Sequence, residues 1–293
     1  MKMSAFLKKS PLLLLGLWIL TACQPQQLLP ANPLPSVKTQ TAIVLPKGAI
    51  EQDVQKDGLN IAMVFVPGGD FLMGSPANDP NAGSDMKPQH KVILDAFWID
   101  KTEVTNALYA KCVGDGVCRS PVNAGENSAQ AYYGNPKYDN YPVQGIRWTD
   151  GQTFCKWAGA RLPSEAEWEK AARGTDGRLY PWGNQPPDAT RLNFDRNVGG
   201  PSAVGSYPAG ASPYGALDMA GNLWEWVADW YSHDFYQRSP ALNPLESEPQ
   251  AYRACRGGSW NSSAERARAD YRGNEDPGQC DSLTTVRCAS SAK

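Results

Sequence analysis

The 293-residue chain has little histidine, no C-x-x-C spacing and no long apolar run, and each shortage argues against a class of protein. Its two histidines, His90 and His233, have no paired cysteines beside them, which argues against a zinc-type metal cluster. The apolar run at residues 11–20 is too short to span a bilayer comfortably. A net charge of −2 without a basic stripe indicates no nucleic-acid partner, and no glycine-rich phosphate loop is visible.

Glycine and proline are abundant instead, with 27 and 24 residues, and there are ten tryptophans and twelve tyrosines. Such a composition favours a turn-rich fold over a helical bundle, because large rigid side chains can hold an irregular backbone by packing around it. With 41% hydrophobic residues the chain can also bury a sizeable core. We therefore expect one large domain rich in loops.

The beginning of the chain has the features of an exported, lipid-anchored segment. Three lysines precede the apolar run, and the letters LTAC that end at Cys23 resemble the lipobox of bacterial lipoproteins. This predicts a signal peptide over residues 1–22, acylation of Cys23, and attachment to a membrane on the extracytoplasmic side of the cell envelope. Residues 23–51 are rich in proline, so we expect a linker followed by one domain over residues 52–293. An ordinary signal peptide with an incidental Cys23 is the alternative.

Six of the seven cysteines remain once Cys23 is set aside as the lipid carrier. They are Cys112, Cys118, Cys155, Cys255, Cys280 and Cys288. An even number outside the cytosol predicts three disulfides, for which spacing alone allows about fifteen pairings. Cys112 and Cys118 flank a loop with two glycines, so this pair is the easiest to close.

Secondary structure is expected mainly in the first 174 residues. Strands are predicted at 61–66, 71–73 and 90–100, and helices from Thr102 to about Cys112, from Thr149 onward, and from Ser164 to a stop at Gly174. Thr149 with Gln152, and Ser164 with Glu167, have the spacing of capping boxes. The rest of the chain predicts turns and short strands.

Several sequence blocks occur in the order found in the formylglycine-generating (sulfatase-modifying factor) family. They are FVPGG at 65–69, DKTEVTN at 100–106, AGARLPSEAEWE at 158–169, YPWG at 180–183, DMAGNLWEW at 218–226 and RGGSW at 256–260. The ordered set spans about residues 60–290 and is far more specific than any single block. The chain therefore resembles this family over its whole expected domain.

The resemblance implies an α+β fold of the irregular C-type-lectin-like kind, with little regular secondary structure, short helices and antiparallel strands. It also implies a disulfide between Cys155 and Cys288, which leaves Cys255 with Cys280 and Cys112 with Cys118. Structural calcium is implied at the positions that match Asp218, Gly221, Leu223 and Glu225, and a second calcium would use Asn193 and Phe194. Carboxylate and carbonyl oxygens are the ligands that calcium prefers. The alternative is that Asp218 and Glu225 only accept hydrogen bonds from loop amides.

The chain departs from the family enzymes where those enzymes hold copper. The family holds copper with two cysteines within about a dozen residues after the RGGS motif, and this chain has none there. Ser262 stands near the first position and residues 264–267 cover the second. A hydroxyl cannot replace a thiolate as a ligand of Cu(I), so we expect neither copper nor formylglycine synthesis. A related branch binds iron through histidines, and His90 and His233 lack the H-x-x-x-H spacing for it, so we expect no iron.

Two functions follow from this comparison. The first is a non-catalytic binding or scaffold module that holds a peptide, a glycan or an envelope protein in the old substrate cleft. The candidate cleft residues are Trp224, Ser259, Trp260, Asn261 and Ser262. The second is an oxidoreductase of the same family that binds its metal through other ligands.

Overall fold

The structure is a computed structural model that describes residues 51–56, 59–121, 132–278 and 283–292. These residues belong to one unit, Ile43–Lys293. The predicted signal peptide, Cys23, most of the predicted linker and Cys280 lie outside the described residues. None of the helices in the described part has the length and apolar character needed to cross a membrane.

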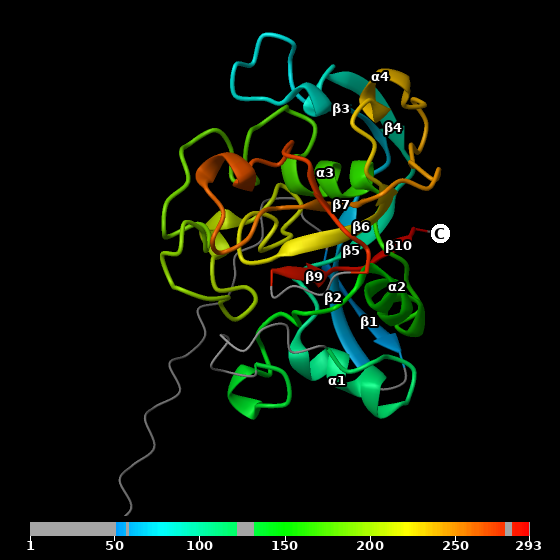
Figure 1. The fold of residues 1–293 in the computed structure, drawn as a ribbon, viewed down its shortest axis with the longest axis vertical. Helices are drawn as coiled ribbons and strands as arrows, with labels where there is room; N and C mark the ends of the chain where they lie inside the picture. Colours follow the sequence, from blue (N-terminus) through cyan, green and yellow to red (C-terminus); the bar gives the residue numbers. More distant parts are fainter. Residues whose placement is uncertain (1–50, 57–58, 122–131, 279–282, 293) are drawn as a thin grey trace, which may run out of the picture. The chain divides into compact units, whose positions relative to one another are not determined.

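The first sheet is antiparallel and joins the two ends of the described chain (Figure 1). Its order is β1 (Glu51–Lys56), β2 (Leu59–Val66), β5 (Phe97–Asp100) and β10 (Ala289–Ser291). Val64 and Val66 of β2 are fully buried, in agreement with the apolar run predicted as a strand at 61–66.

The second sheet consists of β3 (Gly69–Met73) and β4 (His90–Leu94), paired antiparallel. The prediction of one strand over residues 90–100 was therefore wrong, because the chain turns at Asp95 and Ala96 and its second half joins the first sheet. The backbone N–H of Asp95 donates to Asn243 Oδ1 at this turn. The apolar pattern of the segment reads as one strand, since both halves bury alternate side chains.

The third sheet has the order β8 (Gly273–Glu275), β7 (Arg253–Arg256), β6 (Trp224–Trp230) and β9 (Thr284–Val286). Strands β6 and β9 run parallel and the other pairs antiparallel. A short connector, residues 161–163, joins this sheet to the first. Arg161 pairs with Ala289 of β10, and Pro163 accepts a hydrogen bond from Ala228 of β6.

Four α-helices and four 3-10 helices complete the described part. They are α1 (Asn106–Gly114), α2 (Trp148–Trp157), α3 (Glu165–Arg173), α4 (Phe235–Arg238), η1 (Ser84–Met86), η2 (Pro136–Tyr138), η3 (Pro208–Gly210) and η4 (Ala264–Ala267). The predicted capping box of α3 is confirmed, because Ser164 Oγ accepts from Glu167 N–H at 3.1 Å and Glu167 Oε2 accepts from Ser164 N–H at 2.8 Å. Gly174 ends this helix at φ 69°, as predicted.

The starts predicted for the other two helices were wrong. Helix α1 begins after Thr105, whose hydroxyl accepts from Leu108 N–H, while the Thr102 hydroxyl donates to the Glu103 carbonyl. Helix α2 begins at Trp148, where Asp150 Oδ2 accepts from Arg147 N–H at 3.2 Å. At α1 a second threonine within three residues provides the cap, and at α2 the carboxylate that accepts from the N-cap backbone is Asp150, at position N3 of a helix that starts before Thr149.

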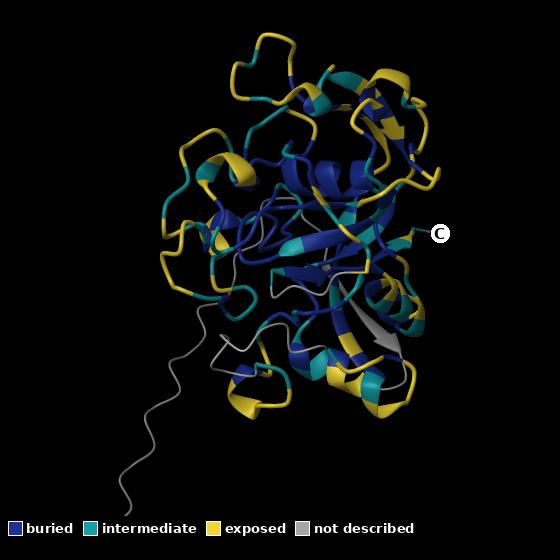
Figure 2. Ribbon diagram, viewed as in Figure 1, coloured by how far each residue is buried: buried dark blue, intermediate teal, exposed yellow. Residues whose placement is uncertain are grey.

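Helix α3 lies at the centre of the fold, against β3, β6 and β7 (Figure 1). All nine of its residues are buried, including its charged ones (Figure 2). Glu165 receives Arg272 through two hydrogen bonds of 2.8 and 2.9 Å, and Glu169 binds both Arg173 and Arg256. The carboxylates are thus paired inside the core, which buried charges require.

Asp229 of β6 lies beside the start of α3 and forms no ion pair with the residues that the structure describes. It accepts hydrogen bonds from Glu165 N–H at 2.7 Å and from Glu246 N–H at 2.9 Å. Burial, together with the negative charge of Glu165, raises the pKa of Asp229 to about 7. This carboxyl group therefore joins helix, strand and loop, while its burial favours the protonated form.

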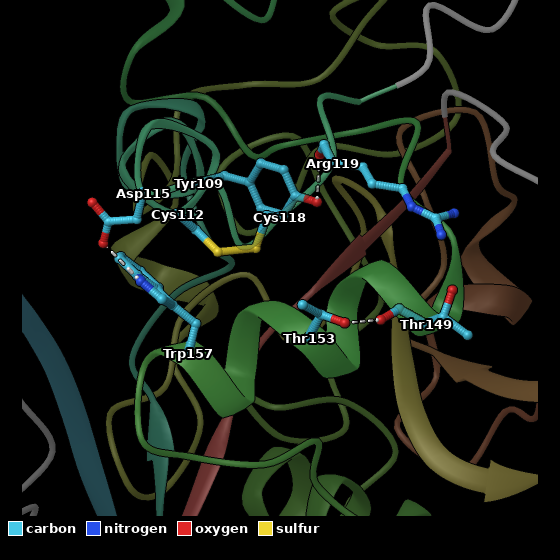
Figure 3. Close-up of a disulfide and its surroundings, with 8 residues drawn as sticks. All are labelled: Tyr109, Cys112, Asp115, Cys118, Arg119, Thr149, Thr153 and Trp157. Carbon is cyan, nitrogen blue, oxygen red and sulfur yellow. Dashed lines mark hydrogen bonds between the residues drawn. A yellow bond between two sulfur atoms is a disulfide. The ribbon is translucent and has the colours of Figure 1, made fainter.

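Two disulfides are formed among the described cysteines. Cys155–Cys288 links α2 to the last strands across 133 residues, as the resemblance implied, and Cys112–Cys118 closes the loop after α1. Figure 3 shows the Cys112–Cys118 disulfide beneath the Tyr109 ring. Near this disulfide, Trp157 Nε1 of α2 donates a hydrogen bond to Asp115 Oδ2 at 2.9 Å. The pairing expected for Cys255 involves Cys280 and so lies outside the described residues.

The two disulfides are expected to differ in their effect on stability. Replacing Cys155 and Cys288 by alanine should lower the free energy of unfolding by about 5 kcal/mol, because that bond closes a long loop in the unfolded chain, whereas the Cys112/Cys118 pair should cost about 2 kcal/mol. All four thiols are buried, so the cavities left are comparable. Urea unfolding of the two double variants measures the difference, and equal losses would contradict the prediction.

The stability of the protein should depend on pH through Asp229. A folded-state pKa of about 7 against 3.8 means that the folded chain holds this proton more tightly than the unfolded chain. The contribution of the group is therefore complete below pH 4 and is lost as the pH rises towards 7. The unfolding free energy of wild type minus that of Asp229→Asn should fall over this range in denaturant titrations, and a constant difference would contradict this.

Candidate functional site

The loop that follows β7 is where the family enzymes bind copper. Its turn begins with Gly257 and Gly258, at φ 96° and 78°. Residues with a side chain rarely adopt these backbone angles. A Cβ on Gly258 would lie 2.9 Å from the carbonyl of Arg266, so the loop crosses itself at this glycine. The conformation is thus set by the backbone rather than by a metal ligand.

Ser259 and Ser262 close this turn by hydrogen bonding to each other. Ser262 Oγ accepts from Ser259 N–H at 3.0 Å, and the two hydroxyl oxygens are also 3.0 Å apart. Ser259 Oγ donates to Asn261 Oδ1 at 2.8 Å. Both serines are buried, so their hydroxyls are used within the loop.

The second copper position falls within η4, at residues 264–267. Ala267 is fully buried and packs in a small apolar cluster with Leu192 and Ala220. The four residues of η4, whose sequence is AERA, contain no thiol at the place where the resemblance implies the second cysteine.

The candidate cleft residues lie next to the 221–223 turn. Trp260 N–H donates to the carbonyl of Asn222 at 2.7 Å, which brings the RGGSW loop beside the strand start at Trp224. Trp224 contacts the Tyr271 ring with centroids 5.9 Å apart. Trp224, Trp260 and Asn261 are half-buried, so they retain surface that a ligand can contact, whereas Ser259 and Ser262 do not.

The carboxylate of Glu225 is held by an arginine and a tryptophan. Arg287 donates from Nη2 to Glu225 Oε1 at 2.6 Å and from Nε to Oε2 at 2.7 Å, and Trp168 Nε1 donates to Oε2 at 2.6 Å. Asp218, at φ 58°, accepts from Gly205 N–H through Oδ2 at 2.6 Å. Both acids are buried and both contribute to the turn that the sequence singled out.

Two further buried acids were not singled out by the sequence analysis: Glu103 bonds to the same turn, and Asp100 lies near Arg287 and Glu225. Glu103 accepts from Asn222 Nδ2 at 2.5 Å and from Leu223 N–H at 3.1 Å, and Asp100 Oδ2 accepts from Cys288 N–H at 2.7 Å. The DKTEVTN block contains both, and its ordered match to the family was the signal that could have found them.

Burial and mutual repulsion raise the pKa values of these carboxyl groups. Desolvation raises the pKa of Asp100 to about 7 and that of Asp218 to about 6. The pKa of Glu103 lies well above its usual value, because of burial first and then the charges of Asp218 and Glu225. Among the four described acids, Arg287 forms an ion pair with Glu225, and burial favours the protonated forms of the other three.

A divalent cation would displace these protons and stabilise the ionised carboxylates, and the donors around Asp218 suit calcium. The carbonyls of Gly221 and Leu223 accept no hydrogen bond from other described loop residues, whereas that of Asn222 is taken by Trp260. Glu225 has less capacity to spare because Arg287 and Trp168 already occupy three of its acceptor positions. In the described ranges, no three His, Cys, Asp or Glu side chains converge on one metal position, so backbone carbonyls would have to complete the shell.

The second implied calcium position shows a buried acceptor that no described residue satisfies. Asn193 is 1% exposed, and its Oδ1 has no hydrogen-bond partner within the described part of the chain. Its Nδ2 donates to the Gly200 carbonyl and to Ser202 Oγ, which directs Oδ1 away from them. Phe194 is half-buried beside it. An orphaned oxygen of this kind fits a cation ligand.

The hydrogen bonds described for the two histidines involve none of the four acids Asp100, Glu103, Asp218 and Glu225. His90 Nδ1 is 3.0 Å from the Pro88 carbonyl, and its ring contacts Tyr236. His233 Nε2 is 3.1 Å from Ser84 Oγ, on the surface. Neither histidine shares a hydrogen bond with Ser259 or Ser262 within the described part of the chain.

Comparison with known proteins agrees with this architecture. The chain matches the family described as "Sulfatase-modifying factor enzyme 1-like domain" over residues 47–292. It is 36% identical to the serine/threonine-protein kinase Pkn1 of Chlamydia trachomatis, over 90% of this chain and 44% of the kinase. It is 31% identical to the formylglycine-generating enzyme of Streptomyces coelicolor, over 78% of this chain and 89% of the enzyme.

A solved structure, PvdO from Pseudomonas aeruginosa, matches with a TM-score of 0.70 and 25% identity, over 83% of this chain and 98% of PvdO. The chain spans less than half the length of the Pkn1 kinase that it matches. The α+β, lectin-like fold expected from the sequence is confirmed. The chain belongs to the family of sulfatase-modifying factor enzyme 1-like domains.

Proposed function

We propose that this protein is a lipid-anchored, extracytoplasmic binding module that keeps the family fold without the family's copper chemistry. One observation supports the proposal: Ser262 and residues 264–267, which stand where the resemblance implies two copper thiolates, include no cysteine. Cu(I) requires soft ligands such as thiolates, and none of these side chains provides one.

The loop geometry supports a binding role for the same surface. The RGGSW turn is held by its own hydrogen bonds, and its half-buried Trp260 and Asn261 lie beside the start of β6. Aromatic rings with a neighbouring amide suit an extended peptide or a glycan, because they combine apolar area with hydrogen-bonding groups. An envelope protein that presents such a segment is the partner we propose.

The anchoring part of the proposal rests on the amino-terminal sequence. A basic stretch, an apolar run and LTAC at Cys23 together support lipidation, and a proline-rich segment supports a tether between anchor and domain. Two disulfides in the described domain are in keeping with an oxidising compartment.

We further propose that calcium is a structural component of the domain. Asp218, Glu225 and the carbonyls of Gly221 and Leu223 would hold one ion, and Asn193 Oδ1 with the Phe194 carbonyl would contribute to another. Bound calcium supplies positive charge that stabilises the ionised forms of the buried carboxyl groups. Asp218 also fixes the preceding loop through Gly205, so this turn and that loop would be stabilised together.

The names of the relatives favour a second candidate, an oxidoreductase. Besides the Streptomyces enzyme, the chain is 31% identical to the hercynine oxygenase of Mycolicibacterium smegmatis over 85% of this chain and 64% of that protein. Such an activity would need ligands other than the two family thiols. Cys255 and Cys280 are the cysteines that could provide sulfur ligands, provided that they do not form the disulfide implied by the resemblance.

Metal analysis and a peptide assay distinguish these two candidates. The protein purified from its native compartment should contain calcium but no stoichiometric copper or iron, and it should leave a cysteine-containing sulfatase-motif peptide unoxidised in the presence of oxygen. The Streptomyces enzyme is the positive control for the peptide assay. Copper or iron at one equivalent, with oxidation of the peptide, would overturn the proposal.

Calcium should raise the thermal stability through Asp218. At calcium concentrations about 100-fold above its dissociation constant, binding to the folded state adds about 2.7 kcal/mol, or about 5–10 °C in Tm. Asp218→Asn should lose most of this increase, whereas Asp234→Asn, at an exposed carboxylate, should keep it. Differential scanning calorimetry with calcium and with a chelator measures both. An unchanged Tm in wild type would contradict the calcium proposal without affecting the binding role.

A further inference from the structure

Four of the seven large apolar side chains that are exposed in the described ranges are brought onto or beside β4. They are Leu72, Ile93, Leu242 and Leu245, which are 40–60% exposed. Clustered exposure of this kind differs from singly scattered apolar residues and marks interaction surfaces. Figures 1 and 2 show exposed residues on β3 and β4 beside the loop that follows α4.

Three of these side chains form a stripe across adjacent strands. In the β3–β4 register Asp70 lies opposite Ile93 and Leu72 lies opposite Lys91, while Phe71 and Val92 between them face the core. Leu72 and Ile93 are therefore diagonal neighbours on the outer face.

Leu242 continues the stripe on the other side of β4. Leu242 forms a parallel bridge with Ile93. The N–H of Ile93 donates to the Ala241 carbonyl at 2.6 Å, and the carbonyl of Ile93 accepts from Asn243 N–H at 2.8 Å. We call the outer surface formed by Asp70, Leu72, Lys91, Ile93 and Leu242 the stripe face.

One acid and one base flank the stripe, on opposite sides of it. Asp70 and Lys91 occupy the other diagonal and form an ion pair of 2.8 Å across the stripe, with side chains 60% and 62% exposed. A two-fold axis along the Leu72–Ile93 diagonal would place each of these leucine and isoleucine side chains against its own copy. The same axis would place Asp70 against Lys91 of the second chain, and Lys91 against its Asp70.

We infer that the stripe face is a self-association surface whose partner is a second copy of this chain. A two-fold interface must be complementary to itself, and this face is, in both its apolar and its charged parts. The apolar stripe supplies the association, and the alternating charges fix the orientation of the two copies, because exposed ion pairs contribute little affinity on their own. Because the stripe face contains only a few apolar side chains, we expect a weak dimer that forms at high local concentration. The inference does not depend on the proposed function.

Charge reversal on the two sides of the stripe provides a sharp test. In Asp70→Lys the flanking charges are both positive, and in Lys91→Asp both are negative, so each variant should repel its own copy. An equimolar mixture of the two should dimerise again, because every cross-chain contact is then between opposite charges. A role of the Asp70–Lys91 pair within one chain cannot produce this recovery.

Sedimentation velocity of the full chain, in mild detergent where the chain is lipidated, measures the dimer fraction over a concentration series. Wild type should show a reversible monomer–dimer equilibrium, each charge variant should weaken it by about tenfold or more, and the mixture should regain it. Leu72→Asp should also abolish the dimer, and it covers the case in which a charge variant does not fold. Val198→Asp, at a 57% exposed valine away from the stripe face, is the matched control and should leave the dimer unchanged.

Two results would overturn the inference. A wild type that stays monomeric over the whole series would leave the stripe face to a partner of other chemistry. A dimer that neither the charge variants nor Leu72→Asp weaken would show that the copies meet elsewhere.

Discussion

The buried guanidinium of Arg287 is the interaction on which the rest of the fold depends. It pairs with Glu225 of β6 and donates to the carbonyls of Asp100 and Leu217, so one side chain near the end of the chain connects both four-stranded sheets and a central loop. Arg173, Arg256 and Arg272 do the same elsewhere, each bonding a carboxylate of α3 and backbone carbonyls of loops. Loops lack the regular backbone hydrogen bonds of helices and sheets, so their buried carbonyl groups need hydrogen-bond donors from elsewhere. The buried guanidinium groups, each with several N–H donors, supply these bonds, which explains how a fold with so little regular structure can be well packed.

The same arrangement is in keeping with a loop that does not need the cysteines implied by the resemblance. The RGGSW turn is set by its glycines and by the bonds between Ser259 and Ser262, while η4 is held by the burial of Ala267. None of these contacts requires a thiol.

Much of the fold could be predicted from the sequence, because local signals and core contacts agree in several places. Ser164 and Glu167 cap α3 as their spacing indicated, and the ordered blocks identified the family. The predicted start of α1 was wrong because two threonines, Thr102 and Thr105, could each cap the helix. The capping energies of such neighbouring residues differ little, so the sequence does not distinguish them. The split of residues 90–100 into two strands was invisible because its cause, the contact of Asp95 with Asn243, lies 148 residues away along the chain. Glu103 was missed for a similar reason: its importance comes from the distant Asn222 and Leu223.

The position of the final strands has a consequence for how the domain is made. Strand β9 completes the third sheet beside β6, strand β10 forms the edge of the first beside β5, and between them lie Arg287 and the half-cystine Cys288. A ribosome delivers these residues after everything that they hold together, because synthesis runs from the amino terminus. Until then both sheets lack a strand and Glu225 lacks its counter-charge. A nascent chain at this stage would expose unpaired strand edges and depend on holding factors, so completion of the domain is a single late event.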